Sequence, residues 1–119
     1  MNRLLSLATL FGLLVATLAQ ADERIRLKVG ASALFSLQEN ITTGYSWRTD
    51  SEASEGLDLI AIADAGRSGA PSKMVGSPSV RHWKITALKP GQAQIVFVYQ
   101  RPWEPAPVQT RRVEVEVAP

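Results

Sequence analysis

The chain has 119 residues, with 13 lysines and arginines, 11 aspartates and glutamates, one histidine and no cysteine. The lack of cysteine excludes disulfides, thiolate metal sites and a cysteine nucleophile, so stability must come from packing alone. The formal net charge is only +2, and the basic residues are scattered apart from Arg111-Arg112. Nothing in this pattern indicates binding to nucleic acid or to anionic lipid.

The N-terminus predicts a secretory signal peptide. Met1-Asn2-Arg3 gives a short positive start, Leu4 to Leu18 is almost unbroken apolar sequence, and Ala19-Gln20-Ala21 supplies a small-x-small cleavage pattern. An apolar run of about 15 residues is short for a membrane span, which needs roughly 20. We therefore expect residues 1–21 to be removed, leaving one domain, residues 22–119, that is periplasmic or secreted, monomeric when free and not attached to the membrane. An uncleaved N-terminal anchor is the other interpretation.

Period-two alternation of apolar and polar residues dominates the remaining chain. Arg24–Val29 places three apolar side chains on one face and cations on the other, and Arg112–Val117 repeats the pattern with acids outside. Their complementary outer faces make these two end strands candidates for pairing with each other. Further short strands are expected at Ala33–Leu37, Tyr45–Arg48, Leu57–Ala63, Val80–Leu88 and Gln94–Gln100. About seven short strands without a helical period predict an all-β, immunoglobulin-like sandwich with no disulfide.

Two connections carry strong local signals. Lys89-Pro90-Gly91-Gln92 combines a proline that presets φ with a glycine that accepts positive φ. It predicts an antiparallel hairpin between Trp83–Leu88 and Gln94–Tyr99. The segment from Asp64 to Ser79 contains three glycines and two prolines among several serines, which predicts a long loop rather than a continuing strand.

Catalytic residues are hard to find. The single histidine, His82, lies in a strand-like alternation, where a side chain on the surface or on the second side of the sheet is expected instead of a general base or metal ligand. No carboxylate has a histidine partner or calcium-loop spacing, and no Gly-x-Ser-x-Gly elbow is present. We therefore expect no enzyme, no cofactor and no metal site.

Three segments are unusual for a purely structural protein. Asn40–Trp47 offers a Thr-Thr-Gly turn before two aromatic residues, of which Trp47 is expected to be the core tryptophan of the sandwich. Gln100–Pro107 has three prolines and places Trp103 too far from the preceding strand for an obvious core residue, although a ring folded over the sheet edge is the other interpretation. Arg67–Ser79 is long and rich in small residues. Because the B–C and F–G loops of such sandwiches emerge at one end, the first two segments should be neighbours.

These segments resemble the chagasin family, the bacterial and protozoan inhibitors of papain-type cysteine peptidases. The family has an Asn-Pro-Thr-Thr-Gly-Tyr-x-Trp segment, a Gly-x-Gly-Gly loop and an Arg-Pro-Trp segment, in that order. Asn40–Trp47 matches the first with Ile41 in place of proline, and Arg101-Pro102-Trp103 matches the last completely. Gly76-Ser77-Pro78-Ser79 occupies the glycine-rich position and keeps its first glycine.

The resemblance implies a reversible, competitive inhibitor that inserts three loops as a wedge into the cleft of a papain-like cysteine peptidase. Thr42, Thr43 and Gly44 would lie over the catalytic cysteine, Arg101 and Trp103 on the primed side, and the 76–79 loop on the non-primed side. The peptidase-binding residues implied in this way are Asn40, Thr42, Thr43, Gly44, Tyr45, Gly76, Ser77, Arg101, Pro102 and Trp103.

Two other classes of function remain open from the residues alone. An immunoglobulin-like carbohydrate-binding or adhesion module would use Trp103 and Tyr45 as stacking platforms. A structural subunit of an envelope assembly would need a stable partner instead. The narrow Thr-Thr-Gly tip favours the inhibitor, because a sugar platform has no use for a wedge of small residues.

Overall fold

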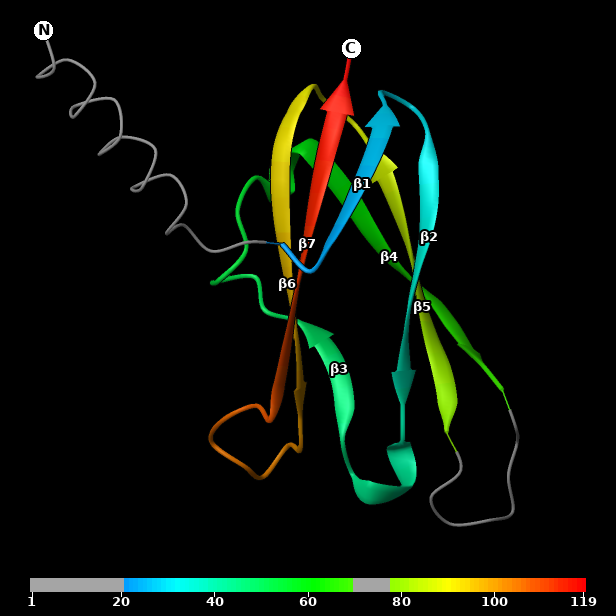
Figure 1. Cartoon of the computed structure of the whole chain (residues 1–119), viewed down its shortest axis with the longest axis vertical. Helices are drawn as coiled ribbons and strands as arrows, with labels where there is room; N and C mark the ends of the chain where they lie inside the picture. The colour runs from blue at the N-terminus through cyan, green and yellow to red at the C-terminus, as the bar shows by residue number, and fades with distance from the viewer. Residues whose placement is uncertain (1–20, 70–77) are drawn as a thin grey trace, which may run out of the picture.

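The computed structural model describes residues 21–69 and 78–119, in which seven strands form two sheets (Figure 1). One sheet has the order β1-β7-β6-β3 and the other the order β2-β5-β4, which confirms the predicted all-β sandwich. The predicted signal peptide falls almost wholly outside the described residues. The bounds are β1 Glu23–Lys28, β2 Ser32–Glu39, β3 Ser46–Thr49, β4 Ile60–Ser68, β5 Ser79–Ala87, β6 Gly91–Gln100 and β7 Gln109–Ala118, with 3₁₀ turns η1 Ile41–Thr43 and η2 Leu57–Leu59.

The core lies between the two sheets and is built from the inward positions of the alternating strands. Aromatic rings occupy its centre: the ring centroid of Phe97 lies 4.6 Å from that of Trp83 and 5.2 Å from that of Phe35. Trp47 is only 3% exposed, as expected for the core tryptophan. The other buried apolar side chains of this cluster are Leu37, Ile60, Ile85, Ala87, Ala93, Ile95, Val113, Val115 and Val117.

The two end strands pair with each other, as their charge patterns predict. β1 runs parallel to β7, with Arg24 opposite Glu114 and Arg26 opposite Glu116. Ion pairs of 3.3 and 3.1 Å join these residues on the outer face. Exposed pairs of this kind contribute about 1 kcal/mol or less each, so the buried apolar face of the two strands supplies most of the pairing energy.

The predicted hairpin around Pro90-Gly91 is wrong, because β5 and β6 lie in opposite sheets. Both edges of β5 are occupied by β2 and β4, and both edges of β6 by β7 and β3. The main-chain N–H groups of Leu88 and Lys89 donate to the carbonyl oxygen of Leu59, which holds the chain against η2 as it leaves β5. Pro90 and Gly91 favour a local reversal of the chain, but they do not decide which strands pair, because β5 and β6 each have their partners in other parts of the chain.

The predicted loop from Asp64 to Ser79 is wrong in its first part, because β4 continues to Ser68. The pairing steps from Asp64–Trp83 to Arg67–Arg81, so β4 carries one extra residue at this point. Gly66 has φ +88°, which glycine adopts without strain, and its N–H donates to Asp64 Oδ1 at 2.8 Å. The glycine that suggested a strand end instead forms a bulge within the strand. Residues 70–77 lie outside the described part of the chain.

The strand predicted at Leu57–Ala63 begins three residues later in the structure than predicted. Leu57–Leu59 form η2, and β4 starts at Ile60. His82 lies on the outward face of β5, as expected, where its ring nitrogens hydrogen-bond to the hydroxyls of Ser36 and Ser68. These contacts join all three strands of the second sheet.

Candidate functional site

The first loop, between β2 and β3, closes on itself through hydrogen bonds to Asn40. The Thr43 hydroxyl donates to the Asn40 carbonyl oxygen and the Thr42 hydroxyl to Asn40 Oδ1, both at 2.7 Å. Gly44 ends η1 with φ +88° and donates its N–H to the Ile41 carbonyl oxygen at 3.0 Å. The tip is therefore held by its own hydrogen bonds, and Ile41, 49% exposed, extends its aliphatic side chain outward.

The second loop, residues 101–108 between β6 and β7, is braced at both ends. The Val108 N–H donates to the Tyr99 carbonyl oxygen at 2.9 Å, and the Gln100 side-chain amide donates to the Glu104 carbonyl oxygen at 2.7 Å. Prolines at 102, 105 and 107 restrict φ between these bonds. Trp103 is 70% exposed, so its ring does not fold down into the sandwich.

The two loops touch, as their predicted positions in the sandwich require. Arg101 Nε donates to the Thr43 carbonyl oxygen at 3.0 Å, and the guanidinium carbon lies 4.2 Å from the ring centroid of Tyr45. Trp103 leans over Gly44 so closely that a Cβ added there would lie 2.6 Å from Trp103 Cη2. Because Arg101 bonds the tip and stacks on its aromatic base, it joins the two loops into one surface.

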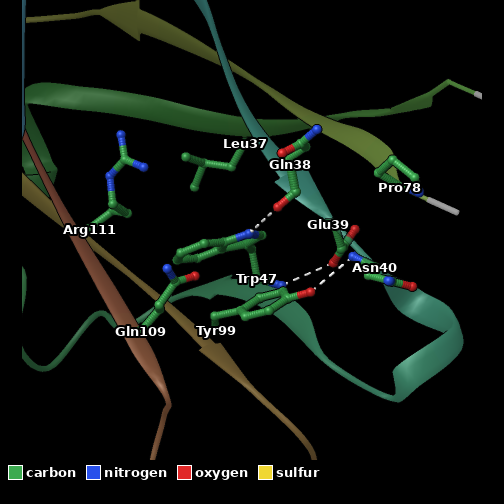
Figure 2. Close-up of a pocket in the computed structure, with 9 residues that line it drawn as sticks. All are labelled: Leu37, Gln38, Glu39, Asn40, Trp47, Pro78, Tyr99, Gln109 and Arg111. Atoms are coloured by element: carbon green, nitrogen blue, oxygen red, sulfur yellow. Dashed lines mark hydrogen bonds between the residues drawn. The ribbon is translucent and has the colours of Figure 1, made fainter. Parts of the chain in front are cut away.

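An aromatic stack supports this surface from below. The Tyr99 ring lies 5.2 Å from that of Tyr45 and 4.8 Å from that of Trp47, measured between centroids. The Asn40 N–H donates to the Tyr99 hydroxyl at 2.9 Å, and Trp47 Nε1 donates to the Gln38 carbonyl oxygen at 2.8 Å (Figure 2). Stacked by Tyr99 and covered by Arg101, Tyr45 belongs to the base of the site and does not form an open platform.

The third predicted segment leaves and re-enters the fold at the same end. Ser68 pairs with Val80 at the end of β4, and Ser79 pairs with Glu39 immediately before the first loop. In Figure 1 the ends of β2, β4 and β6 all point toward this end of the sandwich. Gly76 and Ser77 lie outside the described residues, so only the flanks of this segment are placed. The flanks adjoin the first loop.

A charged cluster that sequence reasoning missed lies beneath the loops. Glu39 is buried and accepts a hydrogen bond from Arg67 Nε at 2.7 Å, while Arg81 Nη2 lies 2.8 Å from Asp64 Oδ2. The Gly66 N–H and the Arg81 guanidinium hydrogen-bond the Asp64 carboxylate and hold its pKa below the usual value. Phe35 and Leu37 point into the core, and Glu39 is the next residue on the same face of the strand, so the period-two alternation would have predicted that Glu39 is buried.

A groove of about 400 Å³ lies beside the first loop, between β2 and the part of β7 nearest the loop end. Figure 2 shows Trp47 and Tyr99 along its floor and Gln109 and Arg111 along its β7 side. Within residues 21–69 and 78–119, no group of three histidine, aspartate or glutamate side chains is placed to hold a metal ion. The same residues include no helix long and apolar enough to cross a membrane.

Loops that are joined at one end of a sandwich are a common place for the contact surface of a binding protein. The chain belongs to the chagasin family: the profile described as Chagasin family peptidase inhibitor I42 matches residues 26–117. This finding confirms the resemblance seen in the sequence, and it makes the protein an inhibitor rather than an enzyme.

Individual relatives agree with the family assignment. Amoebiasin-1 of Entamoeba histolytica is 39% identical over 83 residues, which cover 68% of this chain and 76% of that protein. The crystal structure of the cysteine protease inhibitor EhICP2 from Entamoeba histolytica matches with a TM-score of 0.65 and 26% identity, covering 81% of this chain and 86% of that one. PbICP-C, solved in complex with falcipain-2, matches with a TM-score of 0.62 and covers 83% and 92%; at 23% identity it supports the fold alone.

Proposed function

We propose that this protein is a reversible, competitive inhibitor of papain-like cysteine peptidases that fills the active-site cleft with its loop end. The observation that carries the proposal is the interlocking of the first two loops through Arg101, which presents Thr42–Gly44 and Trp103 as one preformed surface. A preformed surface loses little conformational entropy on binding, so its contacts contribute more fully to affinity. The family assignment and the named cysteine protease inhibitor EhICP2 support the target class.

The shape of the tip explains why it would block the enzyme without being cleaved. Cleavage requires a scissile carbonyl carbon held about 3–3.5 Å from the nucleophile in a reactive alignment. η1 is a tight turn closed by the hydrogen bond from Gly44 to Ile41, and the Thr43 carbonyl is held by Arg101. A peptide bond in this turn is not extended along a cleft, so the tip would occupy the position of the substrate as a plug.

Titration against papain and cathepsin L tests this proposal. We expect the apparent KM for a peptide substrate to rise with inhibitor concentration while kcat stays constant, and activity to return after dilution. Mass spectrometry after incubation should find the inhibitor intact. The absence of inhibition at micromolar excess across several papain-like enzymes would overturn the proposal. Glycan binding without inhibition would favour the alternative of a carbohydrate-binding module.

We also propose that the protein is exported and that cleavage after Ala21 produces a periplasmic or secreted monomer. The signal pattern of residues 1–21 supports this proposal, and so does the position of Asp22. The Asp22 N–H donates to the Arg112 carbonyl oxygen at 2.8 Å, and Asp22 Oδ2 accepts the Arg112 N–H at 2.8 Å. Cleavage between Ala21 and Asp22 would therefore keep the first described residue that hydrogen-bonds to the folded domain. N-terminal sequencing of the protein from cell fractions should begin at Asp22. A cytoplasmic protein that retains Met1 would contradict it.

A further inference from the structure

Among residues 21–69 and 78–119, Glu39 is the one charged residue that is fully buried. Its side chain has 0% exposure, and it is the last residue of β2, directly before the first loop. Burying a carboxylate is unfavourable unless its oxygens are paired, and an apolar residue of similar volume often serves stability at least as well. The position of this charge therefore calls for an explanation in terms of what it holds in place.

The hydrogen-bond partners of Glu39 come from two of the three loop segments, and Arg81 Nη1 of β5 lies 4.0 Å from its Oε1. Oε1 accepts the main-chain N–H of Trp47 at 3.0 Å, where the first loop enters β3. Oε2 accepts Arg67 Nε at 2.7 Å, just before the segment that follows Ser68. The Glu39 carbonyl oxygen accepts the hydroxyl of Ser79 at 3.2 Å, where that segment returns.

The second loop reaches the same junction through the next residue. The Asn40 N–H donates to the Tyr99 hydroxyl, and Tyr99 lies one residue before Gln100 at the end of β6 (Figure 2). Glu39 and Asn40 together thus contact residues at the base of all three loop segments.

The bulge in β4 is what brings Arg67 to Glu39. Continuous alternation from Ile60 and Ile62 through Asp64 would turn Gly66 and Ser68 inward and Arg67 outward. The extra residue between Asp64 and Arg67 shifts the alternation by one, so Arg67 shares the inward face with Arg81, its partner on β5. The hydrogen bond to Glu39 raises the pKa of Arg67 above its usual value, which agrees with a stable ion pair.

We propose that Glu39 is a positioning residue of the inhibitory surface, which fixes the first loop relative to the two flanks of the segment between Ser68 and Ser79. The inference rests on the proposed function, because its effect is read in peptidase inhibition. Glu39 itself is buried and does not contact the enzyme. Loss of its charge frees Arg67 and loosens the spacing between the loops, so inhibitor binding weakens although the apolar core is unchanged.

A double-mutant cycle tests the junction. Glu39→Gln keeps an acceptor for the Trp47 N–H but removes the charge that pairs with Arg67, and Arg67→Met removes the other partner. Each should raise the inhibition constant about tenfold, mainly through faster dissociation. The double variant should be little worse than Glu39→Gln alone, because that substitution already removes the pairing with Arg67, together with the longer contact between Oε1 and Arg81 Nη1 at 4.0 Å. Arg67→Lys, which keeps the charge, should restore inhibition to within about threefold of the original chain.

Glu114→Gln is the matched control. Glu114 also pairs with an arginine, Arg24, at 3.3 Å, but on the exposed outer face of the other sheet. Its substitution should leave the inhibition constant unchanged. Inhibition constants are calculated per folded molecule, from the folded fraction found by denaturant titration. Amide resonances of Trp47 and Ser79 should shift in Glu39→Gln and Arg67→Met, and stay in place in Glu114→Gln.

The outcomes separate this inference from the proposed function. If the unaltered chain does not inhibit any papain-like enzyme, the proposed function fails, and the resonance shifts still decide whether the junction couples the loops. If the unaltered chain inhibits but Arg67→Met inhibits equally well, or if the two losses simply multiply, the positioning role is overturned. Should Glu39→Gln fail to fold, Arg67→Met and Arg67→Lys decide the matter, because Arg67 is 42% exposed and lies at the surface end of the cluster.

Discussion

Replacement of Gly44 by alanine tests the geometry of the tip directly. Gly44 has φ +88°, and an added Cβ would lie 2.6 Å from Trp103 Cη2. Two effects follow: the left-handed conformation costs a non-glycine residue about 1–2 kcal/mol, and the Trp103 ring must move aside. Because Trp103 is mostly exposed, its ring can move without disturbing the core, so the fold should survive.

The expected loss of inhibition can be worked from these two effects. If the enzyme requires the observed turn, strain of this size weakens binding about tenfold, since about 1.4 kcal/mol corresponds to a factor of ten. Displacement of an interface tryptophan adds about 1–2 kcal/mol or more. Together the two effects amount to about 2–4 kcal/mol, so we expect Gly44→Ala to raise the inhibition constant against papain by about thirtyfold to several hundredfold, measured by steady-state titration.

Gly30→Ala is the matched control for backbone strain. Gly30 has φ +91°, and an added Cβ there would meet no atom within 4 Å. Gly30 lies in the connection between β1 and β2, and its N–H donates to the carbonyl oxygen of Ala87. Ala87 is the last residue of β5, at the end of the sandwich away from the loop cluster. The strain should lower Tm by about 4–8 °C for each kcal/mol of stability lost, while the inhibition constant stays unchanged. Equal inhibition by Gly44→Ala and the original chain would refute the reasoning, and so would an equal loss in Gly30→Ala.

Three further predictions concern the loop end. Trp103→Ala should raise the inhibition constant about tenfold or more with little change in Tm, because the ring is 70% exposed in the free protein; an unchanged constant would remove it from the contact surface. Ile41→Pro should raise the free energy of unfolding by about 0.4–1 kcal/mol, because Asn40, with φ −123° and ψ 84°, lies outside the helical region that a following proline disfavours, and proline suits the first position of a helical turn. A lower Tm would contradict this. The lowered pKa of Asp64 means that its contribution to stability is present above its unfolded value near 3.8 and is lost as the pH falls through the lower folded value. Asp64→Asn should therefore show a smaller fall in Tm between pH 5 and pH 2 than the original chain, and identical curves would contradict the assignment.

The alternation of apolar residues made the fold class readable from the sequence. It places Phe35, Leu37, Trp83 and Ile85 on inward faces without any knowledge of the partner strand, because the period of two is a local property of the backbone. The complementary charges of the two end strands likewise predicted their pairing. The same local logic failed at Pro90-Gly91, where a turn signal was read as a hairpin although the strands join different sheets.

The candidate site divides in the same way. The motifs around Thr43 and Trp103 are short and contiguous, so the sequence by itself determined the family and both loops. Tertiary structure alone decided that Arg101 bonds Thr43 and covers Tyr45, because those residues are more than 50 positions apart. It also decided that a one-residue bulge turns Arg67 inward to Glu39. Side-chain periodicity is a local property, whereas the partner of a buried charge depends on the register of strands brought together only by folding.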